Sequence, residues 1–291
     1  MPTVSAPRVT VRTATPDDAA VCGRICYEAF CRINSSHNFP SDFSSPERPV
    51  SLISLLFARP DYYCVVAEAD GRLIGSNCLD QRSLIYGIGP ITVDPAAQNL
   101  GAGRMMMEAA IARARERGAA GIRLVQAAFH NRSLALYTSL GFDAREPLSC
   151  LQGRTVQRSI PGCTVRPAEP RDLEDCNNVS RRVHGFARGV ELAESIDRRI
   201  AVVVERDSRI TGYASSLAFF GHAAADSNPD MQALIASAES FGGSGILVPT
   251  RNAQLMRWCL ANGLRIVQPM TLMTMGLYNE PAGSWFSSIL F

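Results

Sequence analysis

The residues from Gln98 to Gly103 have the types and the spacing of a phosphate-binding loop. Gln98 is followed by Gly101 and Gly103, and the run lies between an apolar segment, residues 87–93, and an amphipathic segment, residues 101–117. Glycines let a backbone approach a ligand closely because they carry no Cβ atom. The first N–H groups of a helix have no intrahelical partner, and the helix dipole adds positive charge there. A strand, a glycine loop and a helix N-terminus in this order therefore predict an anion site.

A dinucleotide-binding fold is the main alternative interpretation of this loop. That fold is marked by Gly-x-Gly-x-x-Gly, and the third glycine of such a motif would fall where this chain has Met106. The run here is Gln-x-x-Gly-x-Gly, and it follows the pair Asp94 and Pro95. The spacing favours a different kind of phosphate loop.

The run resembles the acyl-CoA pyrophosphate loop of the GNAT family, the Gcn5-related N-acetyltransferases, whose signature is Gln/Arg-x-x-Gly-x-Gly/Ala. Downstream, Asn131 opens a helical segment that carries Tyr137, and this segment ends at Gly141 and Phe142, in the order found in the family. The resemblance covers residues 8–153. It implies a mixed α/β sheet of the acyl-CoA N-acyltransferase type for this half of the chain.

The resemblance also implies how the donor, acetyl-CoA as a cosubstrate, would bind. Amides of the loop would hold the pyrophosphate, exposed backbone on the strand before the loop would pair with the pantetheine arm, and an asparagine side chain would add a contact. The residues implied are Ile91, Thr92, Val93, Gln98, Asn99, Leu100, Gly101, Ala102, Gly103, Arg104 and Asn131.

The reaction implied is direct transfer of the acetyl group to a primary amine of a small molecule or peptide. Tyr137 would protonate the departing thiolate, although a core tyrosine on an amphipathic helix is the alternative interpretation. A strand amide near Ile91 to Val93 would stabilise the oxyanion, a contribution of a few kcal/mol, roughly, to the barrier.

The general base is less well defined by the sequence. Many relatives use a glutamate on the strand before the loop, but residues 86–93 carry no carboxylate. His37 and Asp80 lie in loops that border the acceptor cleft in this fold, and a histidine has a pKa suited to base catalysis. His222, in the second half, could line a cavity or could be a structural histidine with its hydrogen bonds satisfied. We expect the base among these residues.

Two functions of different classes stay open. The first is an active acetyltransferase whose second domain shapes the acceptor pocket. The second is a non-catalytic acyl-CoA-binding or regulatory protein. The intact loop with Tyr137 favours the enzyme, whereas the missing strand carboxylate is compatible with the regulatory protein.

The composition describes a globular protein of two ordinary domains. The chain has 291 residues, of which 46% are apolar and 19% charged, which is typical of folded domains. The net charge is only +2, so no field that would recruit nucleic acid or an anionic membrane is expected. No apolar run reaches the length of a membrane span. The predicted partner is a small-molecule amine, and either a monomer or a homodimer is compatible with the sequence.

The cysteines predict neither disulfides nor a metal site. Nine occur, an odd number, and none has the spacing of a zinc site. Cys22 and Cys26 are one helical turn apart, but no second pair completes a ligand set, so buried thiols are expected. Residues 1–9 lack the pattern of a secretion signal. Reduced thiols and no signal predict a cytoplasmic protein.

The chain appears to repeat itself. Residues 11–18 are echoed by residues 165–172, at an offset of 154, and both runs pass from a strand through Pro-x-Asp into a helix. We therefore predict two tandem GNAT folds. The predicted boundaries are an N-terminal domain with the acetyl-CoA site at residues 1–151, a linker at 152–162 and a degenerate C-terminal domain at 163–291.

The second copy is expected to lack the acyl-CoA site. Residues 220–226 align with residues 88–94, but the glycine loop that should follow is shortened and both glycines are absent. Asp230 instead puts a carboxylate at a helix N-terminus, where it would repel a pyrophosphate. The aromatic tail, from residue 275 onward, is expected to pack on the body of the protein.

Periodicity predicts the elements of the first half. Asp70 and Gly71, between two apolar runs, predict a hairpin. In the helix after the loop, a stripe of 3.6-residue period is predicted to face the core; its members are Ala102, Met105, Met106, Ala109 and Ala112. The other elements expected are strands at residues 8–14, 62–68, 73–79, 87–93, 121–127 and 142–151, and helices at residues 17–33, 49–57, 101–117 and 132–140.

Overall fold

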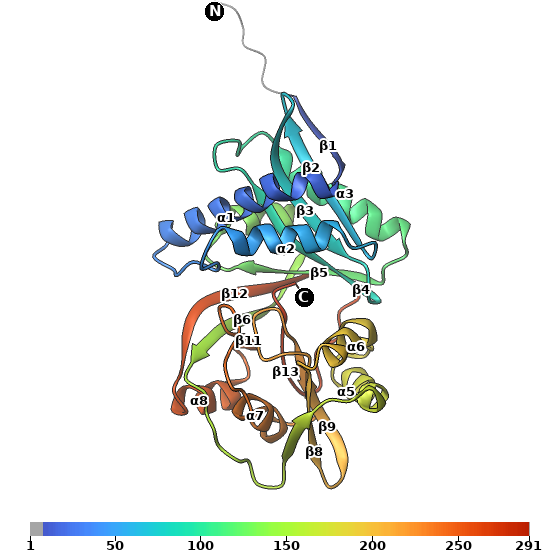
Figure 1. Cartoon of the computed structure of the whole chain (residues 1–291), viewed down its shortest axis with the longest axis vertical. Coiled ribbons are helices and arrows are strands. Elements are labelled where there is room, and N and C mark those ends of the chain that lie inside the picture. Colours follow the sequence, from blue (N-terminus) through green and yellow to red (C-terminus); the bar gives the residue numbers. More distant parts are fainter. Residues whose placement is uncertain (1–7, 291) are drawn as a thin grey trace, which may run out of the picture. The chain divides into compact units, whose positions relative to one another are not determined.

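The structure, a computed structural model, describes residues 8–290. Its contacts divide them into two compact units, the first formed by residues 8–81 and 85–122 and the second by residues 82–84 and 123–290. Figure 1 shows the elements of each unit. Residues 1–7, which hold most of the stretch interpreted above as lacking a secretion signal, lie outside the described residues.

The first unit is built on an antiparallel run of strands with helices on both faces (Figure 1). The strands follow the order β1-β2-β3-β4. Helices α1 and α2 cover one face and α3 covers the other. The elements are β1 (Val9–Thr13), η1 (Pro16–Asp18), α1 (Ala19–Ser36), α2 (Glu47–Phe57), β2 (Tyr62–Ala69), β3 (Arg72–Asp80), β4 (Ile85–Val93) and α3 (Ala102–Glu116).

Side chains of β2 alternate between two apolar layers. Val65 and Ala67 belong to the cluster that includes Met106 of α3, whereas Val66 belongs to the cluster that includes Cys22 of α1. This alternation is the period-two pattern of a strand whose two faces are both buried. The run of strands is thus packed on both faces, and the loop that follows β4 starts from this packed run.

The hairpin predicted between the first two long strands is confirmed. Asp70 and Gly71 have φ angles of 49° and 75°, the left-handed conformation that a tight two-residue hairpin requires. β2 and β3 pair antiparallel on either side of this turn, from Ala69 opposite Arg72 to Tyr62 opposite Asp80.

The predicted apolar stripe of α3 is only partly correct. Met105 is 37% exposed and Ala112 is also exposed, whereas Met107 and Ala110 are buried. The buried stripe is therefore rotated by about one residue from the predicted one. The cause is the run of apolar residues in the first turns of the helix, which fits several faces equally well.

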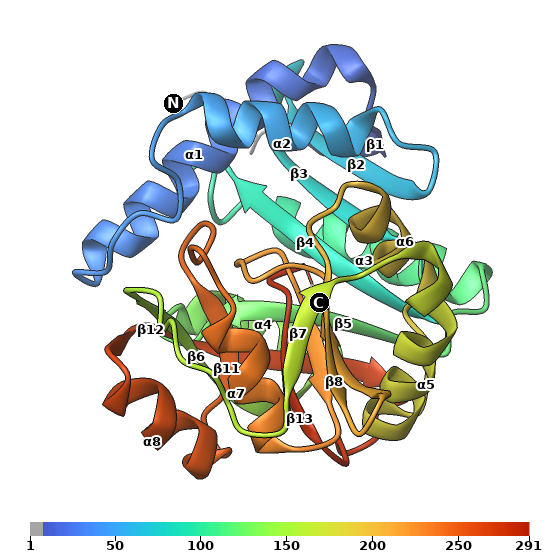
Figure 2. The ribbon, with the colours of Figure 1, turned by 60° about the horizontal axis from the view of Figure 1, so that its bottom comes forward.

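The second unit contains the rest of the chain's elements. They are β5 (Gly121–Ala127), α4 (Asn131–Ser139), β6 (Asp143–Gly153), β7 (Thr164–Pro167), η2 (Pro170–Asp172), α5 (Leu173–His184), α6 (Gly189–Asp197), β8 (Val202–Arg206), β9 (Arg209–Ala214), β10 (Ala223–Ala225), α7 (Asn228–Ala236), β11 (Ile246–Pro249), α8 (Ala253–Ala261), β12 (Leu264–Gly276) and β13 (Ser284–Phe286). One sheet has the order β13-β10-β9-β8-β7. Figures 1 and 2 show α5 and α7 on opposite sides of β8 and β9.

A strand from the end of the chain separates two strands of the first repeat. The order β5-β12-β6-β11 places β12 between β5 and β6, and β12 pairs antiparallel with β6 from Leu264 opposite Gly153 to Thr274 opposite Asp143. Consequently the contact-based division falls between Ile122 and Arg123, not at the predicted linker. The predicted boundaries describe the sequence repeat and stay a prediction.

The two repeats share one element order and one polar motif. The elements from β1 to β6 recur as those from β7 to β12. In the first repeat, Arg12 bridges Asp18, at 2.7 Å, and Glu68, at 2.7 Å. Arg166 makes the same bridge to Asp172, at 2.6 Å, and to Glu205, at 2.7 Å.

The shared bridge ties the 3₁₀ turn after the first strand of each repeat to the neighbouring strand. Its arginine and its aspartate repeat at the offset of 154 residues seen in the sequence. The structure therefore supports the predicted duplication.

Three further findings concern the described residues. All nine cysteines fall within residues 8–290 and are free thiols. Within the same range, no group of three or more potential ligands could hold a metal ion. None of the described helices is both long and apolar enough to cross a membrane.

Candidate functional site

The loop after β4 is folded by its own backbone and by one aspartate. The Asp94 carboxylate accepts a hydrogen bond from the backbone N–H of Ala96, at 2.8 Å, and the Asp94 carbonyl accepts one from Ala97, at 2.9 Å. Further on, Asn99 and Gly101 have φ angles of 75° and 85°. This left-handed conformation suits glycine and, less often, asparagine. The chain therefore turns sharply into α3.

The N-terminus of α3 is left without a side-chain cap among the described residues. Gly101 occupies the N-cap position, no side chain bonds to the cap, and no acidic residue lies in the first turn. The first helical bond runs from the N–H of Met105 to the carbonyl of Gly101, at 3.1 Å. The N–H groups of the turn before Met105 have no helical carbonyl of their own to bond to, and such groups can bind an anion.

Strand β4 is interrupted before it reaches the loop. Leu79 of β3 pairs with Ile88, and Asn77 pairs with Ile91, so two residues of β4 lie opposite one of β3. Such a bulge leaves the extra residue unpaired and bends the strand. Gly89, in the bulge, has a φ of 149° that only glycine adopts readily.

The three residues predicted to line the donor follow this bulge directly. Ile91 and Val93 are half-buried and pack on the α3 side. Thr92 is buried, and its hydroxyl has no hydrogen-bond partner. The sequence Ile91 to Arg104 is thus one continuous stretch of strand, loop and helix start in the first unit.

The other two predicted contact residues lie on α4 in the second unit. Asn131 is the first residue of this helix and is exposed. Tyr137 is buried, with its ring edge-on to Phe142 at 6.4 Å between ring centres. Burial raises the pKa of Tyr137 well above its usual value, so the phenol carries its proton at neutral pH, as a proton donor must.

The candidate bases in the first unit each have a local partner. His37 is the exposed C-cap residue of α1, and its Nδ1 lies 3.0 Å from the carbonyl of Ile33. Asp80, at the end of β3, accepts a hydrogen bond from the hydroxyl of Tyr62 at 2.9 Å. The two residues belong to different elements, and their roles stay predictions.

The corresponding helix of the second repeat is closed by its own side chains. Ser227 caps α7 by accepting a hydrogen bond from the backbone N–H of Asp230. The carboxylate of Asp230 is buried in the first turn and pairs with Arg206 at 3.0 Å. The carboxylate of Asp230 thus lies at the helix N-terminus where the sequence placed it, and the lack of an acyl-CoA site in the second repeat stays a prediction.

The tail of the chain contributes a strand, β13, that pairs with β10 of the second repeat. β13 pairs antiparallel with β10, from Ala223 opposite Phe286 to Ala225 opposite Ser284. The next residue, Ser287, bridges to Leu247 of β11. The tail thus packs on the body, as expected, and it does so inside the sheet region of the second repeat.

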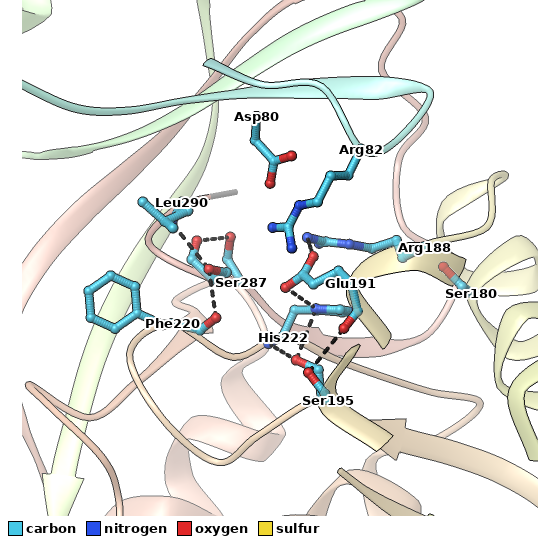
Figure 3. A network of polar contacts seen from close by, with 12 residues as sticks. Asp80, Arg82, Ser180, Arg188, Glu191, Ser195, Phe220, His222, Ser287 and Leu290 are labelled. Atoms are coloured by element: carbon cyan, nitrogen blue, oxygen red, sulfur yellow. Dashed lines mark hydrogen bonds and ion pairs between the residues drawn. The ribbon is translucent and has the colours of Figure 1, made fainter. Parts of the chain in front are cut away.

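His222 lies in a buried polar network that the sequence did not reveal (Figure 3). Its Nδ1 lies 3.0 Å from a carboxylate oxygen of Glu191, and its Nε2 lies 3.2 Å from the hydroxyl of Tyr213. Arg188 donates to the other oxygen of Glu191 at 2.5 Å. Burial acts to raise the pKa of Glu191, but the charges of Arg188 and Arg82 and the interaction with His222 together outweigh it and hold the pKa well below the usual range. The structural interpretation of His222, with its hydrogen bonds satisfied, fits this geometry.

Comparisons with known proteins agree with the geometry of the loop and with the repeat. Residues 28–142 match the model of the acetyltransferase (GNAT) family. No curated protein matches the chain in sequence.

Several solved structures match over nearly the whole length. One is a putative acetyltransferase of Pyrococcus horikoshii, at 18% identity and a TM-score of 0.72, covering 98% of this chain and 96% of that chain. A GCN5-related N-acetyltransferase from Sphaerobacter thermophilus matches at 14% identity and a TM-score of 0.61, covering 94% and 96%. A tandem GNAT protein from the clavulanic acid biosynthesis pathway matches at 13% identity and a TM-score of 0.54, covering 95% and 99%.

The whole chain therefore has the mixed α/β fold of tandem GNAT proteins, and the predicted fold class is confirmed. Residues 28–142 thus match the GNAT acetyltransferase family, and the chain as a whole is similar to solved GNAT structures in fold. Enzymes of this family take their acyl group from acyl-CoA.

Proposed function

We propose that this protein transfers an acetyl group from acetyl-CoA to the primary amine of a small molecule by direct attack. The observation that carries the proposal is the uncapped N-terminus of α3, which follows the left-handed Asn99 and Gly101 inside the family-matched segment. A helix start of this kind binds phosphate through free N–H groups and the helix dipole.

The donor contacts follow the sequence prediction. The pyrophosphate is held by the loop from Gln98 to Arg104, the pantetheine arm pairs with backbone from Ile91 to Val93, and Asn131 adds a side-chain contact. Asn99 and Gly101 are exposed and have positive φ angles, which supports the assignment of the loop to the pyrophosphate.

The chemistry needs a proton donor for the thiolate and a base for the incoming ammonium. We assign the donor to Tyr137, whose raised pKa keeps it protonated. We retain His37 and Asp80 as candidate bases, because the bulged strand β4 offers no carboxylate.

Acetyl-CoA binding can be tested by titration calorimetry on the full chain and on the double variant Gly101→Glu/Gly103→Glu. We expect one site per chain in the wild type and none in the variant. Two sites would show that the second repeat also binds the donor. No binding to the wild type would refute the acetyltransferase function.

A non-catalytic acyl-CoA sensor is the second candidate function, favoured by the missing carboxylate on β4. A screen of arrayed primary amines for thiol release separates the two. Release above the rate of hydrolysis with any amine supports the enzyme, whereas tight binding of acetyl-CoA without an acceptor supports the sensor.

The second repeat then serves the first without binding a donor of its own. This assignment is supported by Asp230 at the start of α7 and by β13 on the edge of β10. We further propose that it helps to shape the acceptor pocket. Nine free thiols support a reducing, cytoplasmic location.

A further inference from the structure

Asn77 is a polar residue buried inside the first unit. It lies on β3 and is 1% exposed. Its side-chain amide donates a hydrogen bond from Nδ2 to the backbone carbonyl of Met106, at 3.3 Å, and the same nitrogen lies 3.8 Å from the sulfur of Met107. Both methionines belong to α3 and are fully buried. Asn77 therefore joins a strand to the helix whose start is the proposed pyrophosphate site.

This amide is not fully satisfied in the folded protein. Its other polar atom, Oδ1, is buried and has no hydrogen-bond partner among the described residues. Turning the amide over would not help, because Oδ1 would then face the carbonyl oxygen of Met106, which only accepts hydrogen bonds. A buried acceptor without a partner destabilises a protein. Asn77 therefore needs an explanation other than stability.

Asn77 also neighbours the strand that is proposed to pair with the pantetheine arm. It lies opposite Ile91 of β4, and Gly75, two residues earlier on β3, lies opposite Val93. Strand residues at this spacing share one face. Ile91 and Val93 pack in the cluster that contains Met106. One face of β3 thus adjoins both parts of the proposed donor site, the strand β4 and the helix α3.

The strands and α3 approach each other closely on this face. A Cβ atom added at Gly75 would lie 2.5 Å from the carbonyl oxygen of Thr92 and 3.1 Å from the terminal methyl carbon of Met106. Both distances are shorter than an ordinary van der Waals contact. The place of α3 on the strands is therefore sensitive to the side chains of β3, and Asn77 adds a directional hydrogen bond to this packing.

We propose that Asn77 is a positioning residue for the donor, which holds the start of α3 in a fixed place relative to the backbone of residues 91–93. This role rests on the proposed function, because it requires that one acetyl-CoA molecule binds to both groups. A ligand that contacts two groups gains the full affinity of both only when their spacing matches its own. Loss of stability at a binding site in exchange for such a match is a common trade-off.

A ligand that spans both groups should depend on Asn77, and a ligand that contacts one group should not. Acetyl-CoA carries both the pyrophosphate and the pantetheine arm. ADP carries a pyrophosphate without that arm, so it would bind at the start of α3 and leave β4 uncontacted. A shift of α3 relative to β4 should therefore weaken the binding of acetyl-CoA and leave the binding of ADP unchanged.

Both ligands are titrated by calorimetry against the full chain and three variants. Asn77→Leu replaces the amide by an apolar group of the same branched shape, and Asn77→Ala removes it. Asn34→Leu is the matched control, because Asn34 is also 1% exposed and also donates from Nδ2 to a backbone carbonyl, that of Pro40, at 3.0 Å. Asn34 belongs to α1, on the face of the strands opposite α3.

We expect both Asn77 variants to bind acetyl-CoA about 10-fold more weakly than the wild type, because a hydrogen bond is lost and the two groups no longer match the ligand. Both should bind ADP as the wild type does. The control should bind both ligands as the wild type does.

Thermal unfolding separates positioning from simple structural support. Asn77→Leu should unfold at a temperature no lower than that of the wild type, because it removes a buried acceptor that has no partner. Asn77→Ala should unfold at a lower temperature, because it leaves a cavity. The two variants should thus lose the same affinity while their stabilities change in different directions. A lower unfolding temperature for Asn77→Leu would show a structural residue and overturn the proposal.

Four binding results would also overturn it. They are wild-type affinity for acetyl-CoA in both Asn77 variants, an equal loss for ADP and acetyl-CoA, a loss in Asn77→Ala but not in Asn77→Leu, and an equal loss in Asn34→Leu. The second would mean that Asn77 supports α3 alone, and the third that only the volume of the side chain matters. Failure of the proposed function looks different, because the wild type itself would then bind no acetyl-CoA.

Discussion

The two glycines at the ends of α3 allow backbone strain to be separated from ligand binding. Gly101 precedes the helix with a φ of 85°, and Gly118 follows it with a φ of 69°. At both positions an added Cβ atom would meet nothing within 4 Å. Gly101→Ala and Gly118→Ala therefore introduce the same kind of strain, about 1–2 kcal/mol each, without a steric clash.

Only one of these glycines lies at the proposed pyrophosphate site. We expect both alanine variants to unfold at lower temperature, by about 2–4 °C for each kcal/mol lost. Gly101→Ala should also weaken acetyl-CoA binding, since the loop must relax to relieve its strain. Gly118→Ala should bind acetyl-CoA as the wild type does.

Gly101→Glu separates the two effects further. A carboxylate about 4 Å from a phosphate charge repels it by about 4 kcal/mol at the effective dielectric of a protein surface, which corresponds to about a thousandfold in Kd. The same carboxylate favours the helix dipole by about 0.3–1 kcal/mol. Gly101→Glu should therefore be more stable than Gly101→Ala and yet bind acetyl-CoA far more weakly.

Calorimetry with acetyl-CoA and thermal unfolding are measured on the wild type and on the three variants Gly101→Ala, Gly118→Ala and Gly101→Glu. The reasoning fails if Gly118→Ala loses as much affinity as Gly101→Ala, because strain in α3 would then explain both. It also fails if Gly101→Glu binds acetyl-CoA as tightly as Gly101→Ala, because no phosphate charge would then lie near this position.

Four further outcomes are expected. Tyr137→Phe should lower kcat strongly with little change in the Kd of acetyl-CoA, and unchanged kcat would exclude Tyr137 as the acid. Arg12 holds the pKa of Asp18 at about 2, against a usual 3.8, so its contribution to stability is complete above pH 4 and lost as the pH falls toward 2. Urea unfolding of Asp18→Asn should show less loss over that interval. Asp230→Ala should destabilise the protein by about 1 kcal/mol without creating a second acetyl-CoA site, as calorimetric stoichiometry would show. A chain truncated after Leu151 should lack cooperative thermal unfolding, because β5 and β6 would lose β12 between them.

Features set by neighbouring residues could be predicted from the sequence. Three such features are the left-handed turn at Asp70 and Gly71, the start of α3 after Gly101, and the carboxylate of Asp230 in the first turn of α7. Each depends on a few consecutive residues whose φ preferences and side chains are known. These are the features that placed the loop and marked the second repeat as different.

Features that join distant segments could not be predicted. β12 pairs with β6 across more than a hundred residues, and alternation along either strand says nothing about which strand becomes its neighbour. The polar network around His222 has the same character, since Glu191 comes from α6 and Tyr213 from β9. Nothing in the sequence near either residue indicates that they share one histidine.

The two repeats differ in what satisfies the same backbone groups. Polar groups of the main chain that are removed from water need partners. In the second repeat the chain supplies these partners. The Ser227 side chain accepts a hydrogen bond from the N–H of Asp230, and β13 pairs with β10. At the start of α3 no side chain of the described residues takes this part. This difference between the repeats is the reason for proposing one donor site in the chain, at the start of α3.

A strand of the second repeat, β12, nevertheless lies between two strands of the first repeat. Because β12 separates β5 from β6, the two strands that α4 joins both pair with a strand from the end of the chain and not with each other. Asn131 and Tyr137, both on α4, thus depend on the second repeat for their support. Removing the second repeat would therefore leave β5 and β6, the strands on either side of the proposed proton donor, without β12 between them.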